Sequence, residues 1–293
     1  MNAKNLAGIY PALITPYTDN NQIGEEALRR IIGLNVEKGV DGFYVGGSTG
    51  EAFVLSLKER KRILEIAVDE NRGRVNIISH IGCISTDDAI ELGVQAKSLG
   101  ANAVSAVPPF YYKFSFEEIK RYYFAIADAV QLPLVVYNIP SLSGVELTPG
   151  NLRELRENPY IVGIKHTSMN LYQLERMHAA DHDLLIFNGH DEVCLAGLTM
   201  GADGAIGSTY NILAEKFIQI RSLYLSGDYK AAYEVQTEAN QVIEALIQVG
   251  VFAGIKYVLY KKYGIDCGPC RAPFSPLPEK SKTFLDGIIE KYL

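Results

Sequence analysis

Eight short apolar runs, separated by longer amphipathic segments, constrain the fold of this chain more than any other feature. The runs occupy residues 8–16, 42–47, 76–82, 103–109, 133–140, 161–168, 184–190 and 204–210. Between them, apolar residues recur at three- and four-residue spacing, which is typical of amphipathic helices. Apolar strands joined by helical crossovers predict a parallel sheet covered on both faces. Eight such strands predict closure into a (β/α)8 barrel.

The starts of several predicted helices carry N-terminal signals. Ser56 with Glu59 and Ser115 with Glu118 fit a capping box, and Thr148 precedes a proline that suits the first helical position. A doubly wound open sheet is the alternative fold. It normally carries a glycine-rich turn after its first strand, whereas the turn here reads TPYTDNNQIG and contains no G-x-G-x-x-G.

After residue 210 the pattern is helical only. The first of these segments completes the barrel, which leaves about three extra helices. A barrel domain of this kind runs to about 250 residues or more as one unit, so 293 residues do not require two domains. We therefore predict a barrel catalytic domain over residues 1–228 and a helical extension packed on it over residues 229–293.

Charge and hydropathy exclude several classes of protein. The net charge is −6 with Lys and Arg dispersed, which offers no surface for nucleic acid or anionic lipid. No apolar run approaches the roughly 18 residues that a membrane helix needs. The N-terminal segment lacks the features of a secretory signal. We expect a cytoplasmic protein.

The spacing of cysteines and histidines bears on metal and redox chemistry. The chain has four cysteines, too few and too scattered for a disulfide framework. The pair CGPC at 267–270 follows a helical segment and enters a proline-rich loop, whereas a redox motif opens a helix after a strand. His178 and His182 have a zinc-like interval without an evident third ligand. We predict no metal.

The run 161–168 reads as a buried strand except for Lys165. Side chains alternate along a strand, so we expect Lys165 to point into the barrel near the carboxyl end, where active sites of this architecture lie. An interior lysine can pair with a carboxylate or extend to solvent. It can also form a Schiff base, because burial favours the neutral, nucleophilic amine. Gly163, two residues earlier, would leave space beside the amine.

Other polar residues follow the ends of other runs. Tyr137 lies one strand earlier, within reach of Lys165 for proton transfer, because neighbouring strands lie about 4.8 Å apart. The segment GGSTGEAF at 46–53 is either an anion-binding loop or a turn that needs glycine. Asp191 is either a ligand contact or a helix N-cap. We expect Ser208 to contact substrate rather than a phosphate group.

Four motifs occur in order: GSTGE near residue 50, YNIP-x-x-S-G at 137–144, G-I-K-x-T at 163–167 and GADGAIGS at 201–208. Over essentially the whole chain they resemble the class I pyruvate aldolases related to dihydrodipicolinate synthase and N-acetylneuraminate lyase. The stretches FNGHDEV and CRAPF are most similar to the lyase branch. The synthase branch carries an arginine two residues after YN-x-P, where this chain has Leu142.

The resemblance implies cleavage of sialic acid to N-acetylmannosamine and pyruvate, without a metal or an organic cofactor. It implies that Lys165 forms the Schiff base and Tyr137 transfers protons, with Ser48 and Tyr111 assisting. It implies substrate-binding roles for Ser48, Thr49, Thr167, Gly189, Asp191, Glu192 and Ser208. It also implies a homotetramer in which Tyr111 reaches the neighbouring subunit's site.

Two alternative functions stay open at this point. One is a related aldolase, such as 2-keto-3-deoxygluconate aldolase or dihydrodipicolinate synthase, with the same lysine and a different pocket. The other is a barrel that binds a ligand without catalysis. Both predict a small-molecule ligand rather than nucleic acid or membrane.

Overall fold

The computed structural model describes residues 3–293. The structure divides into two compact units. The first unit contains the residues up to Gly8 together with Asn76–Ile206, and the second contains Ile9–Val75 and Gly207–Leu293.

Each of the eight predicted runs contains one strand. The strands are β1 (Ile9–Pro11), β2 (Gly42–Val45), β3 (Asn76–His80), β4 (Ala103–Ala106), β5 (Leu134–Asn138), β6 (Ile161–His166), β7 (Leu185–Asn188) and β8 (Gly204–Gly207). Their order in the sheet is β1-β8-β7-β6-β5-β4-β3-β2, the order of a (β/α)8 barrel. The predicted fold class is confirmed.

Helices alternate with these strands and then continue alone. They are α1 (Glu25–Glu37), α2 (Leu57–Asn71), α3 (Thr86–Ser98), α4 (Phe116–Val130), α5 (Pro140–Ser143), α6 (Pro149–Leu155), α7 (Leu171–Ala180), α8 (Cys194–Thr199), α9 (Tyr210–Ser226), α10 (Tyr229–Val249), α11 (Val251–Tyr263) and α12 (Glu279–Tyr292). Four short 3-10 helices are η1 (Lys4–Leu6), η2 (Ser48–Gly50), η3 (Ala52–Val54) and η4 (Asp191–Val193). The caps predicted at Ser56, Ser115 and Thr148 are all confirmed, each hydroxyl accepting a hydrogen bond from the third helical N–H.

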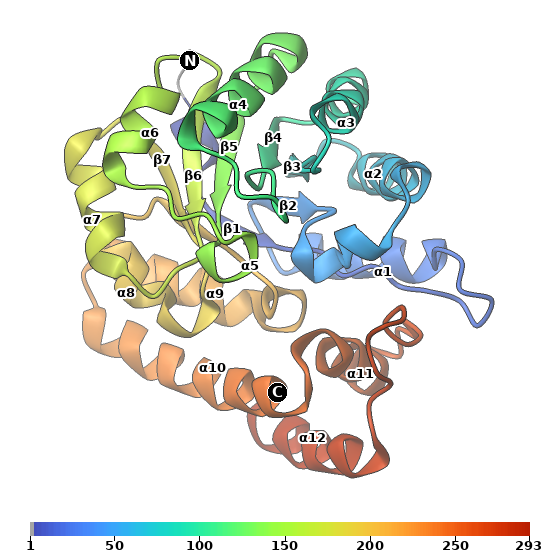
Figure 1. Ribbon diagram of the computed structural model, residues 1–293. Helices are drawn as coiled ribbons and strands as arrows, with labels where there is room; N and C mark the ends of the chain where they lie inside the picture. Colours follow the sequence, from blue (N-terminus) through green and yellow to red (C-terminus); the bar gives the residue numbers. More distant parts are fainter. Residues whose placement is uncertain (1–2) are drawn as a thin grey trace. The chain divides into compact units, whose positions relative to one another are not determined.

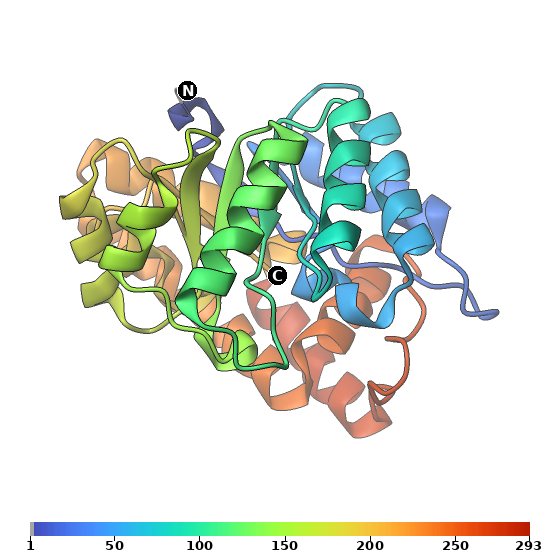
Figure 2. The ribbon, with the colours of Figure 1, turned by 45° about the horizontal axis from the view of Figure 1, so that its top comes forward.

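In the first unit, β3 to β8 pair in parallel in chain order. The residues of β4 to β8 are all buried, which explains why these strands read as continuous apolar runs rather than alternating ones. Helix α3 lies beside α4 in both ribbon views (Figure 1, Figure 2). The register brings the carboxyl ends of β5, β6 and β7 level with one another.

The second unit contains β1, β2 and the helices α1, α2 and α9 to α12. The predicted helical extension is confirmed as α10, α11 and α12, and α10 packs against both α9 and α12 (Figure 1). The division of the chain at residue 228 stays a prediction. Among residues 3–293, no single helix is long and apolar enough to cross a membrane, and the pair α10 and α11 meets that test only when joined across a 116° bend.

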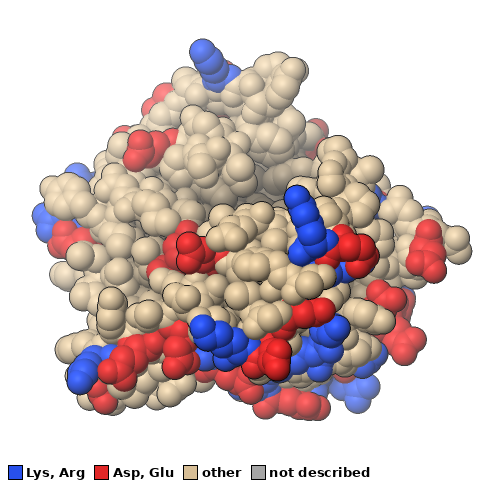
Figure 3. Space-filling view, turned by 90° about the horizontal axis from the view of Figure 1, so that it is seen from below, with Lys and Arg blue, Asp and Glu red and all other residues tan. Residues whose placement is uncertain are grey.

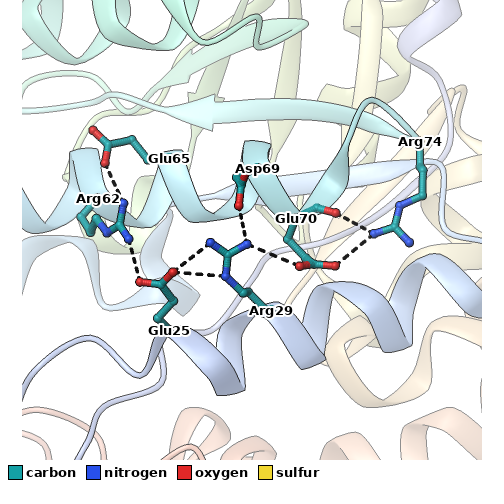
Figure 4. Close-up of polar contacts among 7 residues, drawn as sticks. All are labelled: Glu25, Arg29, Arg62, Glu65, Asp69, Glu70 and Arg74. Carbon is teal, nitrogen blue, oxygen red and sulfur yellow. Dashed lines mark hydrogen bonds and ion pairs between the residues drawn. The ribbon is translucent and has the colours of Figure 1, made fainter.

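Ion pairs join α1 and α2 within the second unit (Figure 4). The Arg29 guanidinium donates to Glu25 at 2.8 Å and to Asp69 at 2.6 Å, and Arg62 reaches the other oxygen of Glu25 at 2.7 Å. These side chains are partly exposed, so the pairs contribute little to the stability of the fold. In Figure 3, acidic and basic side chains lie next to one another along the lower edge of the view.

Candidate active site

Lys165 lies near the carboxyl end of β6, with only 4% of its surface exposed. Its register partners are Tyr137 on β5 and Phe187 on β7. The Lys165 Nζ atom lies 4.0 Å from the centroid of the Tyr137 ring, and Tyr137 is itself buried. The structure therefore brings together the amine and the phenol that the sequence singled out, because equal positions on adjacent parallel strands are neighbours.

Tyr137 also contacts His80, the last residue of β3. The two rings meet edge to face with centroids 5.9 Å apart. The His80 Nε2 atom accepts a hydrogen bond from the Val107 N–H at 3.4 Å, which leaves the proton on Nδ1 in the neutral ring. Tyr137 thus contacts both an amine and an imidazole.

Gly163 lies where β6 and β7 approach one another closely. A methyl group at this position would lie 2.5 Å from the carbonyl oxygen of Leu185, its register partner on β7. The glycine is needed because of this close approach. That Gly163 also leaves space beside the Lys165 amine stays a prediction.

Asn138 and His166 form a buried network next to Lys165 and Tyr137 that sequence reasoning missed. The Asn138 Nδ2 atom donates to His166 Nδ1 at 3.1 Å, and His166 Nε2 donates to the Asn170 carbonyl at 3.2 Å. The Asn138 Oδ1 atom accepts from the Leu147 N–H at 3.3 Å. Burial lowers the pKa of His166, so its ring is neutral at pH 7. The network orders the loops that follow β5 and β6, and its sequence signal is a polar residue ending each apolar strand.

Thr167 and Gly189 lie against one another after β6 and β7. The Thr167 hydroxyl is buried and has no hydrogen-bond partner within residues 3–293. A methyl group on Gly189 would lie 1.9 Å from that hydroxyl oxygen, so only glycine fits here. An unpaired buried hydroxyl is uncommon in proteins, and a ligand oxygen could satisfy it.

Asp191 and Glu192 begin η4. Asp191 is 6% exposed, and the N-cap positions of both η4 and α8 lack a side-chain cap, so the alternative that Asp191 caps this helix was wrong. The Glu192 carboxylate lies 3.3 Å from His190 Nδ1, and this hydrogen bond lowers the pKa of Glu192. Both residues present carboxylate oxygens, which accept hydrogen bonds from hydroxyl groups.

Ser48 and Thr49 lie in the second unit, in the short helix η2 that follows β2. The Thr49 hydroxyl forms a 2.7 Å hydrogen bond with the Ser208 hydroxyl. Within residues 3–293, no acceptor takes the backbone N–H of Ser48 or Thr49. Two adjacent N–H groups without partners can bind an anion. This arrangement favours the anion-binding interpretation of the glycine-rich segment over a plain turn.

Glu51 follows directly and was not singled out from the sequence. Its backbone is left-handed, with φ at 59°, and its side chain is fully buried. A residue other than Gly, Asn or Asp rarely adopts this conformation. The acidic residue of the GSTGE motif was the available signal.

Tyr111 lies in the loop after β4 and has a left-handed backbone, with φ at 77°. Its side chain is 85% exposed and stacks edge to face on Tyr112, with ring centroids 5.1 Å apart. A large apolar ring held on the surface is typical of a binding interface.

Cys267 and Cys270 are buried thiols. Burial raises the pKa of Cys267 to about 12 and that of Cys270 to about 11. Both are therefore protonated at pH 7, and a protonated thiol is a poor nucleophile.

Comparison with known proteins adds independent evidence. A model of the dihydrodipicolinate synthetase family matches residues 5–292. N-acetylneuraminate lyases from Shigella boydii serotype 4 and Escherichia coli strain K12 are 47% identical over 292 residues, which cover 99% of this chain and 98% of each relative.

Solved structures agree. CdNal from Clostridium difficile, in complex with mannosamine, has a TM-score of 0.96 and 41% identity, covering 98% of this chain and 99% of that chain. N-acetylneuraminate lyase from Fusobacterium nucleatum, complexed with pyruvate, has a TM-score of 0.95 and 42% identity, covering 100% and 99% of the two chains. The resemblance inferred from the four motifs is confirmed: the chain belongs to the dihydrodipicolinate synthetase family.

Proposed function

We propose that this chain cleaves N-acetylneuraminate to N-acetylmannosamine and pyruvate through a Schiff base on Lys165. The observation that carries the proposal is the buried Lys165 amine, 4.0 Å from the centroid of the Tyr137 ring. It is supported by the 47% identity to N-acetylneuraminate lyases over nearly the whole chain. Similar structures hold mannosamine or pyruvate, which are close to or identical with the two products.

In the proposed reaction, Lys165 Nζ attacks the C2 ketone of the open-chain sugar, and loss of water leaves an iminium ion. Tyr137, assisted by Ser48 and Tyr111, removes the proton of the C4 hydroxyl. The C3–C4 bond then breaks, its electron pair forms the enamine, and C4 leaves as the aldehyde of N-acetylmannosamine. Protonation at C3 and hydrolysis release pyruvate and the free amine. The lysine thereby replaces one unstable carbanion with a stabilised covalent intermediate.

We propose that Ser48 and Thr49 bind the substrate carboxylate. Their unpartnered N–H groups and the Thr49 hydroxyl supply suitable donors. This role suits a protein with a net charge of −6, in which an acidic substrate needs local donors.

We propose that the polyhydroxylated tail of the sugar contacts Thr167, Gly189, Asp191, Glu192 and Ser208. The unpaired Thr167 hydroxyl and the carboxylates of Asp191 and Glu192 provide hydrogen-bonding groups of the right kind. Ser208 already bonds Thr49, and a hydroxyl keeps capacity for a second hydrogen bond to the tail.

We propose a homotetramer in the cytoplasm, in which Tyr111 completes the site of a neighbouring subunit. The 85% exposure of Tyr111 supports an interface role. Sedimentation of a stable monomer that is fully active would contradict this part of the proposal.

Pyruvate release separates the possible functions. The assay compares N-acetylneuraminate, N-glycolylneuraminate and 2-keto-3-deoxygluconate, and measures pyruvate consumption with aspartate semialdehyde. We expect turnover of the sialic acids and loss of turnover in Lys165→Met. Preference for 2-keto-3-deoxygluconate would overturn the substrate, and turnover of none would favour a non-catalytic binding protein.

A further inference from the structure

The CGPCR segment, residues 267–271, has no role in the proposed reaction and follows the helix α11. Its cysteines are buried, free thiols whose pKa is raised by burial. It lies against Glu51, whose buried carboxylate needs compensation.

The Glu51 carboxylate accepts hydrogen bonds from two groups of the C-terminal part of the chain. Lys256 Nζ on α11 donates to Oε1 at 2.8 Å, in an ion pair whose side chains are 3% and 0% exposed. The Arg271 backbone N–H donates to Oε2 at 2.8 Å. The buried charge is thus fully paired, as a buried charge must be.

Further hydrogen bonds hold Lys256 and the CGPCR segment, which carry these donors, in place. Lys256 Nζ also donates to the Pro269 carbonyl at 3.1 Å, and the Tyr17 N–H donates to the Cys267 carbonyl at 2.9 Å. Gly268 has a φ of 60°, and a methyl group there would lie 2.2 Å from the Tyr17 carbonyl oxygen. The CGPCR segment therefore lies so close to the Tyr17 backbone that position 268 has no room for a side chain.

The position of the Glu51 carboxylate determines the backbone of the preceding residues. Glu51 ends η2, and its N–H donates to the Ser48 carbonyl at 3.0 Å. Its left-handed conformation is one that a glycine would adopt more easily, which indicates that the side chain is retained for its contacts. A second tether is the Thr15 hydroxyl, which donates to the Gly50 carbonyl at 2.7 Å.

We infer that Lys256 and the Arg271 N–H form a C-terminal clamp that holds Glu51 and thereby positions Ser48 and Thr49 to bind the substrate carboxylate. The inference rests on the proposed function of that loop. Lys256 and Glu51 are positioning residues, since they act through the loop rather than on the reacting atoms.

The test measures borohydride labelling of Lys165 at increasing concentrations of two ketones, pyruvate and the uncharged hydroxyacetone. The principal variant is the double substitution Glu51→Met with Lys256→Met, which leaves no unpaired charge in the interior. We expect the half-saturating pyruvate concentration to rise about tenfold or more, since charge-assisted hydrogen bonds are lost. The value for hydroxyacetone should change less than about twofold, because this ketone has no carboxylate to bind.

The control is Lys261→Met on the same helix, which removes only the exposed ion pair with Asp286 and should leave both values unchanged. If the double variant does not fold, Glu51→Gln decides, because it keeps the shape of the side chain but replaces one of the two acceptor oxygens with an amide nitrogen. Glu51→Gln should raise the pyruvate value about two- to fivefold and leave the hydroxyacetone value close to wild type.

Each outcome is decisive. Equal rises for both ketones, or no rise for pyruvate, would overturn the clamp, because a general loss of structure does not distinguish the carboxylate. An equal effect of Glu51→Gln on the two ketones would also overturn it. Absence of labelling at Lys165 in the wild type would instead refute the proposed function.

Discussion

Replacing Gly163 with alanine tests whether the spacing of β6 and β7 sets the position of Lys165. The added methyl group would lie 2.5 Å from the Leu185 carbonyl oxygen and 2.9 Å from the Leu185 Cβ atom. Real Cβ atoms essentially never approach closer than 3.0 Å, so the strands must separate by about 0.5 Å. Lys165 is two residues further along β6 and must shift with the strand.

The displacement of the strands sets the size of two expected effects, one on the unfolding free energy and one on kcat. Overpacking of a well-packed core costs about 1–3 kcal/mol of unfolding free energy. A 1 Å misplacement of a catalytic group can cost about 100-fold in rate, so we expect Gly163→Ala to lower kcat about tenfold. Urea unfolding measures the stability, and pyruvate release from N-acetylneuraminate measures kcat.

Gly287→Ala is the matched control. Gly287 lies in α12, where an added methyl group meets nothing within 4 Å. It should leave kcat unchanged and raise the unfolding free energy by up to about 1 kcal/mol. A Gly163→Ala protein with wild-type kcat and wild-type stability would refute the argument that strand spacing positions the amine.

Three further predictions concern other contacts. Gly189→Ala should raise KM for N-acetylneuraminate about tenfold, because its methyl group would lie 1.9 Å from the Thr167 hydroxyl oxygen and displace it; an unchanged KM would exclude Thr167 from the site. The hydrogen bond from Arg271 lowers the pKa of Glu59 to about 2, so this carboxylate stabilises the fold above pH 4.5 and loses its effect as the pH falls towards 2. Urea titrations should therefore give wild type an advantage of about 1–2 kcal/mol over Glu59→Gln at pH 6, closing with acid, and a pH-independent difference would contradict this. Ser115→Ala should lower the unfolding free energy by about 1 kcal/mol through loss of the capping box, measurable in the same titration, and no loss would show that the cap is redundant.

Much of the fold could be predicted because its signals are local. Alternating strand and helix patterns, and capping residues such as Ser56, depend on neighbours within a few residues. Strand ends were less predictable. The run 8–16 contains only the three-residue strand β1, because Ala12 to Thr15 are buried without continuing the strand. A buried loop and a buried strand both read as apolar residues, so the sequence does not show where the strand ends.

The candidate site likewise contains some contacts that the sequence predicts and others that it does not. Lys165 and Tyr137 could be placed together because they occupy equal positions on consecutive parallel strands. The contact of Glu51 with Lys256 joins residues 205 positions apart, and no local pattern predicts it. The need for glycine at position 163 was not predictable for a related reason, since its close neighbour is the backbone of another strand.

The central claim is that Lys165 supplies the amine that bonds the ketoacid. The most direct measurement is borohydride reduction of the protein with pyruvate, followed by peptide mass analysis. The account predicts one reduced pyruvate adduct on Lys165, absent from Lys165→Met. An unmodified Lys165 with the adduct on another side chain would contradict it.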